Sequence, residues 1–136
     1  MQRYFIEMSY LGTRYNGWQV QPNGLTIQAE LEKALSILLR EEVKTTGAGR
    51  TDTGVHASFF VAHFDTSYDA LNRDHDFLYS LNELLPCDIS IKEIVAVTDS
   101  AHARYSALSR TYQYHIARTK DPFSIETAWY LSLIHI

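Results

Sequence analysis

Cysteine is almost missing from this 136-residue chain, in which Cys87 is the single example. One cysteine excludes an internal disulfide and a zinc site built from several thiolates. The six histidines show no metal-binding spacing, and His63 and His115 are expected to pack within strands. No apolar run reaches the roughly 18 residues of a membrane-spanning helix, and the start shows no secretory leader. These absences predict a protein without metal or membrane anchor, in a reducing compartment that we take to be the cytoplasm.

Charge of one sign is concentrated in one part of the chain. Residues 65–100 contain two Lys/Arg against eight Asp/Glu, whereas residues 101–136 contain four against two. The net charge of −4 therefore comes from the acidic segment. A local positive surface is still compatible with this charge distribution, formed by Arg104, Arg110 and Arg118. Charge alone nevertheless favours a solvated acidic helix and scattered surface arginines.

Hydrophobic residues make up 46% of the chain, enough for the core of one folded domain. Strands are predicted where apolar and polar residues alternate, at 3–10, 58–64, 89–97 and 110–118, with a short one around 43–46. Helical spacing predicts two helices, one from Thr26 as N-cap to near Arg40 and one over 71–85, ended by Pro86.

The order of these elements, β-α-β-β-α-β with a further strand, is typical of an α+β ferredoxin-like fold. This split-βαβ, RRM-like arrangement has an antiparallel sheet with two helices on one face. The uncovered face of the sheet must meet solvent, a second domain or RNA. The apolar ending TAWYLSLIHI indicates a truncated reading frame and leaves open whether residues 131–136 are native.

The segment GAGRTDTGVHA (47–57) has the pattern most suggestive of chemistry. It is neither a dinucleotide-binding fingerprint nor a P-loop, because the glycine spacing differs and no Lys-Ser/Thr closes it. Arg50 stands two positions before Asp52, so we expect it to hydrogen-bond this carboxylate and keep it ionised. An ionised carboxylate can act as a nucleophile or a base. A surface turn shaped by an ion pair in a small interaction domain explains these residues equally well.

Two other segments mix aromatic and basic residues. Tyr10, Tyr15 and Trp18 near Arg14 suit base stacking and phosphate contact, although a lone tryptophan such as Trp18 more often fills the core. The segment ARYSALSRTYQYHIAR (103–118) groups three arginines with three tyrosines. This mixture suits RNA contact, and it also suits aromatic packing between strands.

Three segments, in the expected order, resemble the TruA-type tRNA pseudouridine synthases: YLGTRYNGWQVQPNGLTIQAELEKAL (10–35), GAGRTDTGVHA (47–57) and HARYSALSRTYQYHI (102–116). The resemblance extends to about residue 130. It implies an isomerase that converts uridine to pseudouridine at positions 38–40 of the tRNA anticodon arm, without cofactor or metal. It also implies a cytoplasmic homodimer that takes part in tRNA processing.

The resemblance also implies roles for individual residues. Asp52 corresponds to the catalytic aspartate and nucleophile, Arg50 is expected to position the extruded nucleotide, and Tyr112 is expected to lie against the target base. Candidate RNA-binding residues are the arginines near these segments, namely Arg14, Arg104 and Arg110.

Enzymes of this type have two similar halves. The resemblance therefore implies that residues 1–118 form the N-terminal, ferredoxin-like catalytic half and that residues 119–136 begin the connection to a second half. Because a basic partner for the aspartate is expected from that second half, we expect this chain alone to be inactive. The alternative is a split-βαβ module that binds RNA without chemistry.

Overall fold

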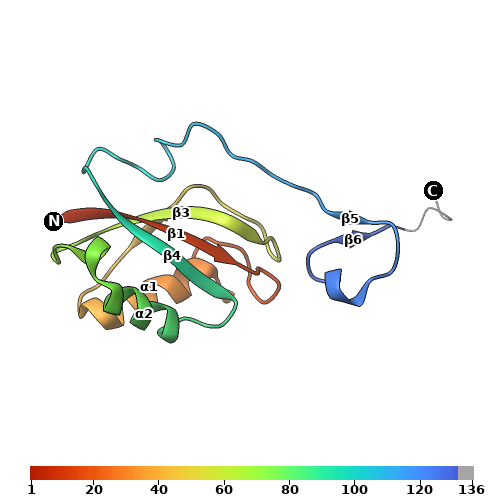
Figure 1. Ribbon diagram of the computed structural model, residues 1–136, viewed down its shortest axis with the longest axis horizontal. Helices are drawn as coiled ribbons and strands as arrows, with labels where there is room; N and C mark the ends of the chain where they lie inside the picture. The colour runs from red at the N-terminus through yellow and green to blue at the C-terminus, as the bar shows by residue number, and fades with distance from the viewer. Residues whose placement is uncertain (132–136) are drawn as a thin grey trace.

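The computed structural model describes residues 1–131, so the question about residues 131–136 lies almost wholly outside it. Its main body is a four-stranded antiparallel sheet in the order β2-β3-β1-β4, with both helices on one face (Figure 1). The elements are β1 (Gln2–Tyr10), α1 (Ile27–Leu39), β2 (Thr45–Gly47), β3 (Ala57–Thr66), α2 (His75–Leu84) and β4 (Ile89–Val97). The predicted α+β fold, a four-stranded antiparallel sheet with two helices packed on it, is confirmed.

Strand β1 runs through the middle of the sheet and shows why the alternation predicts the fold. Its even-numbered side chains face the helices and are at most 4% exposed: Tyr4, Ile6, Met8 and Tyr10. Its odd-numbered side chains, from Arg3 to Ser9, lie on the other face and are partly exposed. Successive strand residues point to opposite faces, so a period of two puts one set into the core.

Helix α1 begins and ends as its sequence predicts. The Thr26 hydroxyl accepts the N–H of Ala29 at 3.2 Å and caps the first turn. The helix buries Leu31 and Leu35 completely and ends at Arg40, whose φ of 55° is left-handed. A left-handed residue after the last turn is a common helix terminator.

The predicted helix over 71–85 is divided in two. Residues Leu71–Arg73 form a short 3-10 turn, η1, and α2 starts only at His75. Asp74 separates them because its carboxylate accepts the N–H of Phe77 at 2.9 Å and caps α2 from an extended backbone. Side-chain bonds of this kind favour a cap over a continuous helix. The predicted end before Pro86 is confirmed, since α2 stops at Leu84.

The predicted strand over 110–118 is wrong. Only β5 (Ile116–Ala117) is a strand, and it pairs in parallel with β6 (Trp129–Tyr130), across a 3-10 turn η2 (Pro122–Ser124). Residues 98–115, which we call the strap, cross the open side of the sheet without joining it (Figure 1). A strand needs a partner edge for its backbone groups, and a favourable side-chain pattern does not supply one.

The strap is held against the open face near its beginning. Arg3 donates from Nη1 to the Ala101 carbonyl at 2.8 Å, and the Ala103 N–H donates to Nδ1 of His63 at 2.9 Å. His63 is 5% exposed, so its predicted packing within a strand is confirmed. His115 instead lies exposed at the end of the strap, outside any strand, and the prediction for it is wrong.

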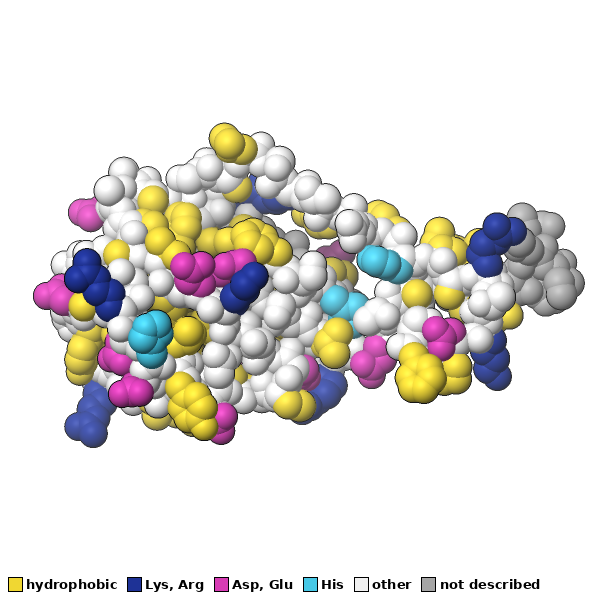
Figure 2. All heavy atoms as spheres, in the orientation of Figure 1, with side chains coloured by type: hydrophobic (Ala, Val, Ile, Leu, Met, Phe, Trp, Pro, Cys, Tyr) yellow, Lys and Arg dark blue, Asp and Glu magenta, His cyan; other side chains and the backbone are white. Residues whose placement is uncertain are grey.

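Beyond the strap, the chain forms a small lobe around β5 and β6 at one end of the molecule (Figure 2). Its hydrophobic side chains are largely uncovered, with Phe123 97% and Ile125 74% exposed. Within residues 1–131, none of the helices has the length and apolar character required to cross a bilayer.

Candidate active site

The segment from Gly47 to Ala57 joins strands β2 and β3, and we call it the carboxylate loop. Asp52 lies in its middle, where its carbonyl accepts the N–H of Val55 at 3.1 Å and closes a turn. Gly54 within this turn has a φ of 81°, which a glycine adopts without strain. The side chain of Asp52 is exposed. The loop therefore presents one carboxylate to solvent from a defined turn.

Thr51, the residue before Asp52, is anchored through both its backbone and its side chain. Its carbonyl accepts the Trp18 N–H at 3.3 Å, and its hydroxyl is 3.0 Å from the Tyr10 hydroxyl. Burial raises the pKa of Tyr10, so the phenol remains neutral and able to share its proton. Gly17 has a φ of 83°, and a side chain there would collide with the Thr51 carbonyl.

The far end of the carboxylate loop is fixed by His56. Its Nδ1 accepts the N–H of Gly12 at 2.8 Å, which leaves Nε2 as the protonated nitrogen that contacts the Glu126 carbonyl. Nearby, the Gly54 N–H donates to the Tyr15 carbonyl at 3.2 Å. The loop that precedes α1 thus supports the carboxylate loop along its length.

The aromatic residues considered for base stacking belong to the core instead. Tyr15 and Trp18 are each 1% exposed, and Tyr10 is 4% exposed. The Trp18 ring lies 4.6 Å from the Phe60 ring, centroid to centroid. The Tyr15 hydroxyl donates to Asp88 at 2.6 Å, and burial with this contact raises the pKa of Tyr15 well above its usual value. Base stacking on these three rings is therefore excluded in this structure.

Arg14, the basic residue near these three aromatic rings, is exposed. Its guanidinium lies 3.5 Å from the Asp88 carboxylate, while 64% of its side chain is exposed. The Asp88 side chain is only 10% exposed, so the exposed member of this pair is the guanidinium, which a second anion can also approach from solvent.

The expected hydrogen bond between Arg50 and Asp52 is absent from residues 1–131. Both side chains are exposed, and exposed charges gain little by pairing because both stay hydrated. They line the same shallow hollow of about 240 Å³, together with polar neighbours that include Asn16, Gln19 and Gln21. An ion-paired turn therefore does not explain the loop, whereas a polar hollow around a free carboxylate suits a polar substrate.

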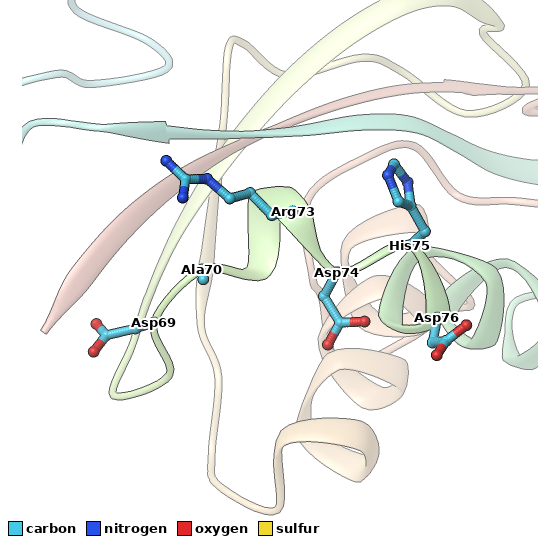
Figure 3. Close-up of a pocket in the computed structure, with 6 residues that line it drawn as sticks. All are labelled: Asp69, Ala70, Arg73, Asp74, His75 and Asp76. Carbon is cyan, nitrogen blue, oxygen red and sulfur yellow. The ribbon is translucent and has the colours of Figure 1, made fainter.

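A larger and more open hollow of about 580 Å³ lies elsewhere, around η1 and the start of α2. Figure 3 shows Asp74 and Asp76 directed to one side and Arg73 to the other. The lining includes three aspartates, among them Asp69, and it shares no residue with the hollow at Asp52. An acidic lining repels phosphate, so this hollow is a poor place for RNA.

The remaining predicted site residues lie on the strap. Tyr112 is 63% exposed, and its ring is free to meet a ligand. Arg104 is exposed, with its guanidinium 5.8 Å from the ring centre of Tyr105. Arg110 donates from Nε to the Ala48 carbonyl at 2.8 Å and from Nη2 to the Arg104 carbonyl at 2.9 Å. The structure thus brings Arg110 to the carboxylate loop, and it places Arg50 and Asp52 in one hollow.

Sequence reasoning missed the residues that brace the loop. The hydrogen bonds of Tyr10, Thr51 and His56 join residues 41 to 70 positions apart in the sequence. No local sequence pattern predicts such pairs. The glycines at positions 12 and 17 are the one usable signal, because each lies where a neighbouring backbone carbonyl leaves no room for a side chain.

Together these features define an α+β domain of the split-βαβ class that presents a single braced carboxylate beside an arginine- and tyrosine-rich strap. A family model described as tRNA pseudouridine synthase matches residues 7–106. The chain belongs to this family, in its TruA branch. The match includes the carboxylate loop and the beginning of the strap.

Curated relatives agree with this assignment. A tRNA pseudouridine synthase A from Parabacteroides distasonis is 50% identical over 132 residues, covering 96% of this chain and 52% of the relative. The protein of that name from Bacteroides fragilis is 52% identical over 124 residues, covering 91% and 49%. The one from Aquifex aeolicus is 40% identical over 131 residues, covering 95% and 54%. The chain spans about half the length of the curated relatives it matches.

Proposed function

We propose that this chain is the catalytic half of an enzyme that isomerises uridine to pseudouridine at positions 38–40 of the tRNA anticodon arm. The observation that supports this most is the carboxylate of Asp52, exposed in a polar hollow on a loop whose backbone is anchored on both sides. Its relatives carry the name tRNA pseudouridine synthase A. Residues 1–118 form the catalytic half in this proposal, and residues 119–136 begin the connection to a second half.

Asp52 is the nucleophile in this proposal. The anchored turn fixes the backbone from which the Asp52 carboxylate reaches its target, which lowers the entropic cost of reaction. Arg50 lines the same hollow and positions the extruded nucleotide through its phosphate or base. Tyr112 offers an exposed ring for the target base. Arg14 and Arg104, both exposed, contact the RNA backbone in this proposal.

The proposed reaction needs no external reagent. The N1–C1′ bond of uridine breaks and a C5–C1′ bond forms, so the atoms of substrate and product are the same. The proton on C5 leaves, and N1 takes up a proton. The bond that the Asp52 carboxylate forms to the substrate breaks again before product leaves, so the carboxylate is regenerated. A paired uridine must first leave its stack, which costs a few kcal/mol that protein contacts to the RNA can offset.

The test uses a chimera in which this chain replaces the matching half of the Parabacteroides distasonis relative. Pseudouridine formation is followed by tritium release from anticodon-arm RNA labelled at C5 of uridine. We expect release from the wild-type chimera and a fall on the order of 10³-fold or more in Asp52→Asn. The control is Asp69→Asn, which changes an exposed carboxylate of the acidic hollow instead.

Unchanged release in Asp52→Asn would refute the role of Asp52. No release from a folded wild-type chimera would refute the proposed function of the chain.

A second candidate function is RNA binding without chemistry. The exposed tyrosines of the strap support it, since Tyr105 is 77%, Tyr112 63% and Tyr114 91% exposed. In that case the 136-residue chain binds tRNA in a salt-dependent manner, Tyr112→Ala weakens binding, and Asp52→Ala leaves it unchanged. A binding assay with an inactive chimera that still shows this pattern would favour the module over the enzyme.

A further inference from the structure

The side chain of Arg110 joins the strap to the carboxylate loop. Its Nε donates to the carbonyl of Ala48 at 2.8 Å, and its Nη2 donates to the carbonyl of Arg104 at 2.9 Å. The first bond connects residues 62 positions apart, and the second closes the strap on itself. One guanidinium thus holds three backbone segments together.

The carboxylate loop is shaped to receive this side chain. A side chain on Gly49 would approach Nε of Arg110 to 3.3 Å and its Cδ to 3.6 Å. Arg110 therefore packs against Gly49, and a side chain there would press on the guanidinium. The Ala48 N–H donates to the Val61 carbonyl at 2.8 Å, so the residue whose carbonyl accepts from Arg110 is itself bonded to β3.

Arg110 is also the last anchor before Tyr112. Earlier anchors of the strap are the bonds of Ala101 to Arg3 and of Ala103 to His63. Among the residues that the structure describes, the stretch 111–114 makes no hydrogen bond to the sheet or its loops. The next backbone bond is that of the His115 carbonyl with Trp129, in the small lobe.

We propose that Arg110 is a positioning residue: it fixes the strap to the carboxylate loop and so sets where Tyr112 lies relative to Asp52. The edge of its guanidinium that includes Nε and Nη2 would grip a phosphate in a bidentate manner, and here two backbone carbonyls occupy it. Arg110 therefore acts through the strap and does not serve as a phosphate ligand. The catalytic importance of placing Tyr112 relative to Asp52 rests on the proposed function. The hydrogen bond between Arg110 and Ala48 does not depend on it.

Lysine separates the two roles, because it keeps the charge of arginine but has a single nitrogen that cannot span both carbonyls. If Arg110 is a positioning residue, Arg110→Lys abolishes its function as fully as Arg110→Ala does. A phosphate ligand is largely kept in Arg110→Lys. Gly49→Val tests the same contact from the carboxylate loop. It crowds the Arg110 side chain without replacing any arginine, so the charge of the protein is unchanged.

The first readout is nuclear magnetic resonance on the ¹⁵N-labelled 136-residue chain. We expect the backbone heteronuclear NOE of residues 111–114 to fall to a similar extent in Arg110→Lys, Arg110→Ala and Gly49→Val. Arg118→Lys, the same change in an exposed arginine nearby, is the matched control and leaves it unchanged. Combining Arg110→Lys with Gly49→Val should add nothing, because both remove one contact.

The second readout is tRNA affinity as a function of salt. A positioning role predicts the wild-type salt slope in Arg110→Lys and Arg110→Ala, whereas loss of a phosphate contact in Arg110→Ala lowers the slope by about 0.7 to 0.9. In the chimera, Arg110→Lys lowers kcat about tenfold or more and leaves the Kd for tRNA within about twofold.

Arg110→Lys with a wild-type NOE and kcat would overturn the proposal, as would a reduced salt slope in Arg110→Ala. An inactive wild-type chimera would instead refute the proposed function. The NOE comparison would still decide whether Arg110 positions the strap.

Discussion

Residues 1–97 and residues 98–131 differ in how their side chains are buried. The first region buries a continuous core between sheet and helices, and Trp18, at 1% exposure, is among its largest fully buried side chains. In the second region Ala103 is the one buried residue, and Trp129 is 64% exposed. Asp52 belongs to the first region and Tyr112 to the second. The proposed site therefore needs individual hydrogen bonds to join a rigid part to a loosely held one.

The two tryptophans should give the largest contrast between the regions. Trp18→Ala removes a ring packed against Phe60 and Gly47, and we expect it to destabilise the protein by about 3–5 kcal/mol. Trp129→Ala on the exposed lobe should change the free energy of unfolding by less than about 0.5 kcal/mol. Urea unfolding followed by far-UV circular dichroism measures both. Equal losses would mean that the lobe contributes to the core.

His63 in β3 accepts a hydrogen bond from Ala103 of the strap and so links the two regions. Its ring should make the free energy of unfolding depend on pH. Burial, with Arg3 and His102 nearby, lowers the pKa of His63 to about 4 from an ordinary 6.5. Between these values the unfolded chain binds a proton that the folded chain does not. Stability contributed by His63 is therefore complete above pH 6.5 and falls as the pH drops toward 4, by up to about 3 kcal/mol.

Urea unfolding between pH 5 and pH 7 measures this effect. The carboxylates with lowered pKa, Asp65 beside Arg3 and Glu41 beside Thr66, have ordinary values of 3.8 and 4.5, so they titrate below this window. His63→Asn keeps an acceptor for the Ala103 N–H and should flatten the slope. His115→Asn on the strap serves as control. A slope that survives in His63→Asn would show that another group is responsible.

A smaller effect should separate two tyrosines of β1 that face the same core. Tyr10→Phe removes the hydroxyl that contacts Thr51, and Tyr4→Phe removes one that donates to the Tyr68 carbonyl at 2.8 Å. Tyr10→Phe should cost about 1 kcal/mol, and Tyr4→Phe more, because the Tyr4 hydroxyl also accepts the Leu71 N–H at 3.3 Å. Only Tyr10→Phe should speed amide exchange at Gly54 and Val55, next to Asp52. Equal acceleration in both variants would mean that Tyr10 stabilises the whole domain and not the loop.

The first region was predictable because its signals are local. Alternation along β1, the cap at Thr26 and the stop at Pro86 each act within a few residues, and the structure places them as expected. Asp74 shows the limit, since an internal cap broke a helix whose hydrophobic spacing looked continuous. Asp52 could be predicted as a candidate from the sequence because its loop carries a compact motif.

The second region was not predictable in the same way. Arg110, Tyr112 and Ile116 alternate like a strand, but the strap pairs with no strand of the four-stranded sheet. Single long-range contacts hold this region to the sheet and its loops, among them those of Arg110 with Ala48 and of Ala103 with His63. Pairings so distant in the chain leave no periodic trace in a single sequence. The same holds for Thr51 and its partner Tyr10.

The most direct test of the account measures stability and chemistry on one substitution. Asp52→Asn in the chimera should leave the free energy of unfolding within about 0.5 kcal/mol, because the side chain is exposed. The same protein should form no detectable pseudouridine in anticodon-arm RNA under conditions where the wild-type chimera converts it fully. A variant that is stable and still makes pseudouridine would contradict the claim that this loop supplies the catalytic carboxylate.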